Sequence, residues 1–188
     1  VHIVDMDVAL PVGTAVLGVQ NEHLAELLGT LGAVLEHGAH GGVAVDVGVF
    51  PLDVVLQRGF EGQILVPFAI ESSLSGVQRS FLPTDRLWYR KEFTLDSDWK
   101  GRSVILHFGA VDYRCTVWVN GKEVGNHIGG NNPFSFDITP YLNKKGAQTI
   151  ELTVTDPTDS ESITRGKQQL NQQGIWYTPV SGIWQTVW

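Results

Sequence analysis

Short segments that alternate apolar and polar residues, or are apolar throughout, follow one another after residue 62 and constrain the fold more than any other feature. None of this region shows the sustained spacing of a helix, and turn residues separate the segments. The first contains Pro67, which predicts an edge or irregular strand. Seven or eight strands in this length predict a mainly β protein, a β-sandwich of the jelly-roll kind. The predicted strands span residues 64–70, 87–95, 103–108, 115–119, 122–124, 134–138, 150–154 and 183–188.

Two of these segments flank Asn120 and Gly121, a pair that tolerates the positive φ angles of a type I′ turn and therefore predicts a tight hairpin. Cys115 alternates with Val117 and Val119, so we expect it to be a small core residue. Aromatic residues at alternate strand positions are expected in the core as well. These are Trp88, Trp118, Phe134, Phe136, Trp184 and Trp188.

Charge and aromatic content divide the chain into two parts. Residues 1–62 hold eight of the 20 acidic residues but one base, Arg58, and they contain no Lys, Trp or Tyr. The net charge of -7 therefore resides in this first part, while residues 63–188 have equal numbers of acids and bases. Such a step predicts an acidic N-terminal segment followed by a separate β domain.

The composition excludes several classes of function. Nucleic acids are bound by clustered Lys and Arg, which this acidic chain lacks. Membrane-spanning helices need about 18 consecutive apolar residues, and no apolar run approaches that length. A single cysteine rules out an intrachain disulfide, and the start carries acids where a signal peptide would be basic. This pattern favours the cytoplasm without fixing the localisation.

The N-terminal segment has its own folding pattern, predicted as strand, helix and strand. Asn21 is suited to cap a helix over residues 21–37 that Gly38 would end. Valines alternate over residues 43–49, which predicts a half-buried strand. The helix would carry an apolar stripe formed by Leu24, Leu27, Leu28, Leu31 and Leu35. Because that stripe must be buried, we expect either packing on the sandwich or a homo-oligomer formed through this helix or an edge strand.

Several motifs in residues 63–188 resemble the N-terminal sugar-binding domain of family 2 glycoside hydrolases, the β-galactosidase and β-glucuronidase family. They read LWYRKEF (87–93), FGAVDY (108–113), VWVNGKEVG (117–125) and PFSFDIT (133–139), with ILVPFAIES (64–72) and SGIWQ (181–185) as first and last signatures. The resemblance implies a jelly roll with a galactose-binding-like topology. It implies no relative for residues 1–62, which we interpret as a segment of different origin, from a fusion or an out-of-frame reading.

The resemblance also implies that the catalytic glutamates lie on a barrel domain beyond the matched region. Retaining glycosidases need two carboxyl groups about 5 Å apart. The glutamates in residues 63–188 are scattered over different strands and loops, and we interpret them as solvated or turn carboxylates: Glu71, Glu92, Glu123, Glu151 and Glu161. We therefore expect no catalytic residues and a non-catalytic carbohydrate-binding domain. The motif residues 112–114 are expected to form a structural hydrogen-bonded corner.

Three alternatives remain open. His2, His23, His37 and His40 invite a metal interpretation, but their spacing fits no zinc pattern, and we expect neither a metal nor a cofactor. A small hydrolase would use Ser72, Ser73 or Ser75 with His107 or His127, although no nucleophile elbow is present. The third alternative is a structural or dimerising module without activity.

Two polar, aromatic loops are the best candidates for weak carbohydrate binding, because sugars stack on aromatic rings and hydrogen bond to planar amides. Residues 125–133 contribute His127, Asn131 and Asn132, and residues 168–179 contribute Gln172, Trp176 and Tyr177. The resemblance implies that both loops face the sugar pocket. Many relatives place an acid where Trp176 stands, so their sugar preference is not carried over.

Overall fold

The structure, a computed structural model, describes residues 2–3, 43–51, 60 and 62–188, and these are mainly β. The predicted helix at 21–37 lies outside the described residues. Within them, helical structure is confined to three 3-10 turns: η1 (Ser73–Ser75), η2 (Ser97–Trp99) and η3 (Thr139–Tyr141). None of the helical segments described is long and apolar enough to cross a membrane.

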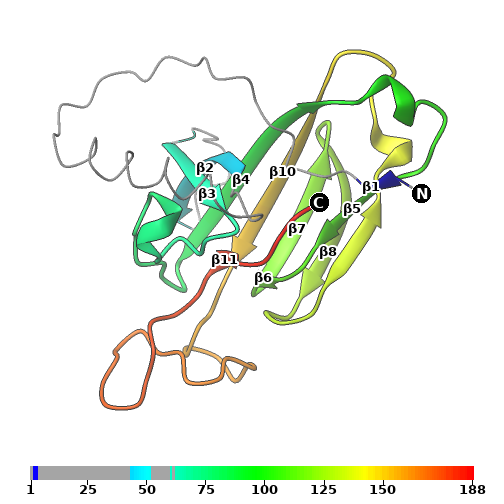
Figure 1. Cartoon of the computed structure of the whole chain (residues 1–188). Coiled ribbons are helices and arrows are strands. Elements are labelled where there is room, and N and C mark those ends of the chain that lie inside the picture. The colour runs from blue at the N-terminus through cyan, green and yellow to red at the C-terminus, as the bar shows by residue number, and fades with distance from the viewer. Residues whose placement is uncertain (1, 4–42, 52–59, 61) are drawn as a thin grey trace, which may run out of the picture.

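The larger sheet is antiparallel and has the strand order β3-β2-β4-β10-β7-β8 (Figure 1). Its members are β2 (Val43–Pro51), β3 (Gly62–Val66), β4 (Asp85–Thr94), β7 (Arg114–Val119), β8 (Lys122–Ile128) and β10 (Ala147–Thr155). The strand predicted at 64–70 corresponds to the edge strand β3, which ends at Val66, before Pro67. The valine-rich strand predicted at 43–49 is also confirmed, and it lies between β3 and β4 rather than outside the sheet.

The second sheet is smaller, with the order β1 (His2–Ile3), β5 (Val104–Phe108) and β9 (Phe134–Asp137). Two short strands, β6 (Val111–Asp112) and β11 (Gly182–Ile183), form a separate pair. The strand predicted at 183–188 is only partly formed. After β11 the chain returns beside β5, where the Trp188 N–H donates to the His107 carbonyl at 3.1 Å and the His107 N–H donates to the Trp188 carbonyl at 2.8 Å.

One hydrophobic core joins residues of both sheets, as in a β-sandwich. Leu87 and Tyr89 of β4, Leu152 of β10 and Leu106 and Phe108 of β5 are each no more than 2% exposed. Burying such side chains supplies most of the stability, at about 25 cal/mol per Å² of apolar surface. The jelly-roll strand order stays a prediction.

Strand alternation corrects the expectation that all strand aromatics lie in the core. The inward residues Leu87, Tyr89 and Val117 are buried, so Trp88 and Trp118 between them point to the opposite face of the sheet. There the two indole rings stack with centroids 5.5 Å apart. Phe134 does contact the core, where its ring stacks on Phe108 at 4.9 Å.

The hairpin predicted at Asn120 and Gly121 is confirmed, with φ angles of 51° and 75° in the turn between β7 and β8. The Asn120 side-chain amide donates to the Tyr141 carbonyl at 2.9 Å, and its oxygen accepts from the Thr149 N–H at 2.9 Å. Cys115 is 4% exposed, as expected of a core residue, and burial raises the pKa of its thiol to about 12.

Candidate functional site

A long irregular excursion, residues 156–181, leaves the sandwich after β10 and returns at β11 (Figure 1). Hydrogen bonds hold its two ends together. The Ser181 hydroxyl donates to Asp156 Oδ2 at 2.8 Å, and the Thr158 N–H donates to Asp156 Oδ1 at 2.7 Å. The Ser181 N–H donates to Glu71 Oε2 at 3.0 Å, which adds a second carboxyl group from the segment after β3. Carboxylate groups therefore accept the hydrogen bonds that join the two ends of the excursion.

A third carboxyl group, Asp112 at the end of β6, belongs to the same acid cluster, which we define as Glu71, Asp112 and Asp156. Asp112 is 6% exposed, and burial raises its pKa to about 7; the negative charges of Asp156 and Glu71 act in the same direction. A side-chain hydrogen bond from Gln168 opposes the rise. A structural corner was predicted for residues 112–114. Asp112 in addition lies in a buried polar site with two other acids.

The loop after β8 packs directly on this cluster. A Cβ atom added at Gly130 would lie 2.6 Å from Asp112 Cγ, so only glycine fits against the carboxyl group. The indole Nε1–H of Trp184, just after β11, donates to the Gly130 carbonyl at 2.8 Å. Segments after β8 and β11 are in this way fixed around Asp112.

Glu71 stands in a turn, as the interpretation of the five glutamates allowed, but its carboxyl group is largely buried rather than solvated. Burial raises the pKa of its carboxyl group above the ordinary value, although hydrogen bonds from Ser181 pull in the opposite direction. Its second oxygen, Oε1, is buried and accepts no hydrogen bond from any described residue. A buried carboxylate oxygen without a partner is costly, so a ligand donor at this position would be favourable.

Glu71 lines a hollow of about 290 Å³ between the excursion and the segment after η1. Polar side chains from Gln78, Ser80, Gln172 and Thr178 line it together with Phe81, Leu82, Leu170 and Pro179. This mixture of an acid, amides, hydroxyls and apolar surface matches the groups that hold small polar ligands.

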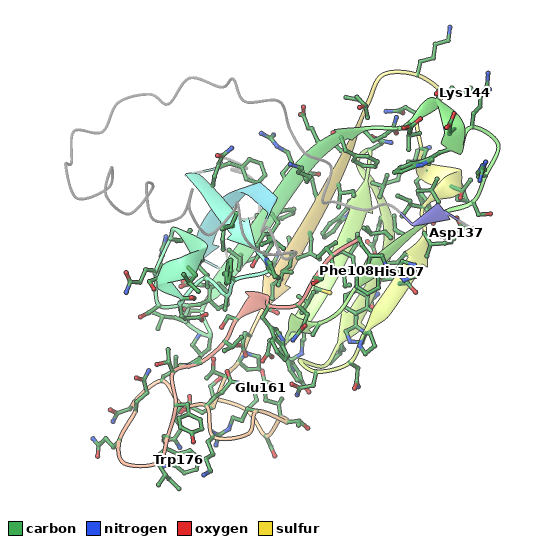
Figure 2. The ribbon with its side chains drawn as sticks, viewed as in Figure 1. His107, Phe108, Asp137, Lys144, Glu161 and Trp176 are labelled. Carbon is green, nitrogen blue, oxygen red and sulfur yellow. The ribbon has the colours of Figure 1, made fainter. Side chains whose placement is uncertain are left out.

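The three candidates predicted in residues 168–179 all lie in the excursion, and one of them lines the hollow. Gln172 Oε1 accepts from the Thr178 hydroxyl at 3.3 Å. Trp176 is 36% exposed and has the Arg165 guanidinium 5.9 Å from its ring centroid. Tyr177 is 62% exposed with the Lys167 ammonium 5.8 Å from its ring. Figure 2 shows Trp176 near the far end of the excursion, away from His107 and Phe108.

The three candidates predicted in residues 125–133 lie elsewhere. His127 belongs to β8 rather than to a loop, and its ring stacks on Phe134 with centroids 4.1 Å apart. Asn131 and Asn132 are exposed in the turn between β8 and β9. Within the described part of the chain, no hydrogen bond joins these three to Gln172, Trp176 or Tyr177. The structure therefore divides the predicted ligand set into two groups.

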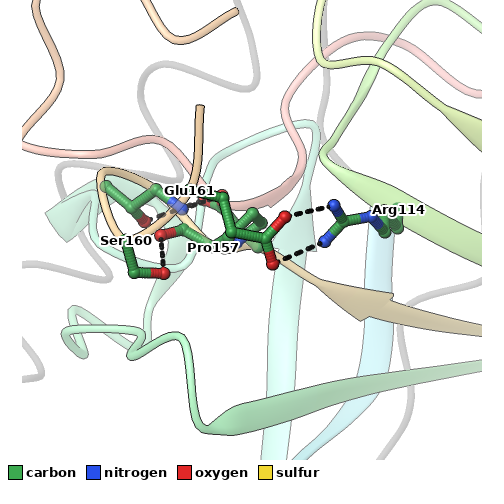
Figure 3. Close-up of polar contacts among 6 residues, drawn as sticks. Arg114, Pro157, Ser160 and Glu161 are labelled. Atoms are coloured by element: carbon green, nitrogen blue, oxygen red, sulfur yellow. Dashed lines mark hydrogen bonds and ion pairs between the residues drawn. The ribbon is translucent and has the colours of Figure 1, made fainter. Parts of the chain in front are cut away.

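Glu161, an acid outside the cluster, pairs with an arginine at the surface. It forms a bidentate ion pair with Arg114, with Nη2–Oε2 and Nη1–Oε1 distances of 2.6 and 3.4 Å (Figure 3). The pair lowers the pKa of Glu161, and both side chains are largely in solvent. Here the interpretation of Glu161 as a solvated carboxylate is confirmed.

The serine and histidine residues considered for hydrolysis make structural contacts. Ser72 caps η1 through the Leu74 N–H, and the buried Ser75 hydroxyl donates to the Ser72 carbonyl at 2.7 Å. His107 stacks on Trp188 with centroids 5.0 Å apart. Among the residues that the structure describes, no group of three or more His, Cys, Asp or Glu side chains is arranged to hold a metal ion. His23, His37 and His40 lie outside that part of the chain.

Residues 67–187 match the model of the sugar-binding domain of glycosyl hydrolases family 2. The chain belongs to this family, and the matched domain is its N-terminal sugar-binding domain.

Curated relatives carry the domain as a small part of a longer chain. The β-galactosidase of Thermoanaerobacter pseudethanolicus is 35% identical over 101 residues, 54% of this chain and 13% of that protein. A β-glucuronidase of Formosa agariphila is 31% identical over 101 residues, 54% of this chain and 10% of that protein. A Ruminococcus gnavus β-glucuronidase structure shares the fold, with a TM-score of 0.52 and 21% identity over 61% of this chain and 21% of its own. The chain thus spans a small fraction of these relatives.

Sequence reasoning missed the acid cluster. Glu71, Asp112 and Asp156 are all at least 41 positions apart in the sequence, so no local spacing marks them as a group. The available signal was positional: Asp156 follows the strand predicted at 150–154, and Glu71 and Asp112 lie near the ends of the ILVPFAIES and FGAVDY segments. That pattern alone does not distinguish a buried carboxyl group from a turn residue.

Proposed function

We propose that this chain is a non-catalytic carbohydrate-binding domain whose ligand site is the hollow beside Glu71. The single observation that carries the proposal is the buried Glu71 Oε1, which has no hydrogen-bond partner in the described part of the chain and belongs to a residue lining that hollow. Sugar hydroxyl groups are the donors that such an oxygen lacks.

The surrounding residues support the same ligand class. Gln172 and Thr178 offer an amide and a hydroxyl at one wall, and Gln78 and Ser80 offer the same chemistry at the other. Phe81, Leu82 and Leu170 supply apolar surface against which the C–H face of a pyranose would pack. Membership in the family, whose matched domain is described as sugar binding, agrees with this assignment.

The affinity is expected to be weak. The hollow of about 290 Å³ is at the lower limit of small-molecule sites, which measure roughly 300–1,000 Å³. Trp176 and Tyr177 lie in the same excursion and are exposed, so we propose that they extend the site for longer saccharides. His127, Asn131 and Asn132 would contact only a ligand that also reaches the turn after β8.

The test is a titration of the full chain with galactose, glucuronate and oligosaccharides, followed through backbone amide signals in NMR spectra. We expect millimolar binding with shifts at residues 71, 172 and 178. Glu71→Gln should weaken binding about tenfold, because it removes a charge-assisted hydrogen bond. Glu92→Gln, a matched change at an exposed glutamate of β4, should leave binding unchanged.

Two results would overturn the proposal: no spectral change with any sugar at tens of millimolar, or equal affinities for Glu71→Gln and the unmodified chain. Hydrolysis of p-nitrophenyl glycosides or esters by the purified chain would contradict its non-catalytic part.

A further inference from the structure

The outer face of the larger sheet, opposite the core, carries a second site that is separate from the Glu71 hollow. It is a groove of about 380 Å³, within the size range of small-molecule sites. We call it the outer groove. It is lined by Arg86, Arg114, Cys115, Thr116, Trp118, Glu123, Asn126, His127, Ile128, Thr153 and Thr155.

Strand register places two arginines on either side of one threonine in this groove. Thr155 of β10 pairs with Arg114 of β7, and its neighbour Val154 pairs with Leu87, which brings Thr155 opposite Arg86 of β4. Because adjacent strands are about 4.8 Å apart, the two arginines flank the Thr155 hydroxyl on neighbouring strands. Guanidinium groups arranged around a hydroxyl are suited to one carboxylate or sulfate.

The two arginines differ in how they are satisfied. Arg114 is held by the bidentate pair with Glu161, which fixes its position at the end of the groove. Arg86 Nε is buried and has no hydrogen-bond partner among the described residues. A buried charged donor without an acceptor is destabilising, so an anionic acceptor at Arg86 would be favourable.

Groups that recognise a sugar ring adjoin this cationic end. In the next register row, Thr153 pairs with Thr116, and Thr116 pairs with Asn126, which together provide two hydroxyls and an amide. Trp118 lines the groove with its ring stacked on Trp88. Glu123 opposes it at the far end, so the groove accommodates a single anionic group better than a polyanion.

We propose that the outer groove binds a pyranose unit carrying one anionic group, a uronate or a singly sulfated sugar. The anionic group would accept hydrogen bonds from Arg86 and from the Thr155 hydroxyl. The ring hydroxyls would bond to Thr116, Thr153 and Asn126, while one ring face packs against Trp118. Neutral sugars would lose the contact with Arg86.

Binding is measured on the full chain by NMR, through the indole signals of Trp88 and Trp118, with four probes: methyl glucuronide, glucose 6-sulfate, methyl glucoside and sodium sulfate. We expect both anionic sugars to shift these signals, and their relative affinities identify the anionic group. Arg86→Gln should weaken their binding about tenfold. Arg102→Gln, at an exposed arginine in the turn before β5, and Glu71→Gln should not change it.

The proposal is overturned if the neutral glucoside binds as tightly as the anionic sugars, or if none of the sugars shifts the indole signals. Equal effects of sodium sulfate and of the anionic sugars would show simple anion binding and would also overturn it. Circular dichroism checks that Arg86→Gln folds. Should it not fold, Asn126→Ala, an exposed change, replaces it, and unchanged affinity there would contradict the proposal.

Discussion

The apolar layer between the sheets and the acid cluster at one end of the sandwich are both shielded from water, but opposite physics governs them. Leu106, Phe108 and Leu152 gain free energy by leaving water. Asp112 and Glu71 lose free energy on burial, which their raised pKa values record. The first region stabilises the fold at any pH, whereas the second lowers its stability when ionised. Substitutions in the apolar layer should therefore lower stability, whereas removing the charge of a buried acid should raise stability above the pH at which that acid ionises.

The largest effect is expected in the apolar layer. Phe108→Ala removes a ring that is 2% exposed and stacks on Phe134, and it should lower the free energy of unfolding by about 3–5 kcal/mol. Urea denaturation measures the change. Leu74→Ala, at a residue 52% exposed, is the matched control and should have little effect. Similar losses of unfolding free energy for both variants would contradict the assignment of Phe108 to the stabilising core.

The next effect concerns Asp112, whose pKa rises from 3.8 to about 7 in the folded chain. Between these values the folded state binds more protons than the unfolded state, so stability falls as pH rises and the full penalty is present above about pH 7. Asp112→Asn should remove roughly 2–4 kcal/mol of this loss between pH 4 and pH 8. Denaturation curves at several pH values measure it, and identical pH profiles for both proteins would refute the assignment.

A smaller effect is expected where the loop after β8 contacts the cluster. Gly130→Ala places a Cβ atom 2.6 Å from Asp112 Cγ and should cost about 1–3 kcal/mol of unfolding free energy. Gly62→Ala in β3 is the control, because nothing lies within 4 Å of the added atom. If both variants unfold at the same denaturant concentration, the loop does not pack on Asp112 as described.

The smallest effect is expected for Glu161→Gln, which breaks the solvent-exposed pair with Arg114. Exposed ion pairs contribute little, so thermal unfolding should be almost unchanged, and any difference should shrink with added salt. A loss as large as that of Gly130→Ala would mean that this carboxylate belongs energetically with the buried acids.

Local sequence pattern predicted much of the fold, because strand alternation and turn chemistry are encoded by neighbouring residues. The hairpin at Asn120 and the burial of Cys115 follow from such short-range rules. The outward orientation of Trp88 was missed because alternation defines two faces without saying which one is buried, and large aromatic rings favoured the wrong choice.

The sites were less predictable, because they depend on contacts between residues distant in sequence. Gln172 was predicted from its amide and lines the hollow, but its neighbour Glu71 is about 100 positions away. Arg86 and Arg114 flank Thr155 only through the register of three strands. The periodicity of a single segment does not determine how that segment is aligned with its neighbours in the sheet.

Because of β2, the region that matches the family is shorter than the region that forms the larger sheet. Family resemblance covers residues 67–187, yet β2 supplies hydrogen bonds to β3 on one side and β4 on the other. Without β2, β3 and β4 would each lose a hydrogen-bonded neighbour. Both would then have an unpaired edge to which other chains could pair. We therefore expect cooperative folding to extend upstream at least to residue 43, so that a domain boundary drawn from homology alone would divide a single sheet.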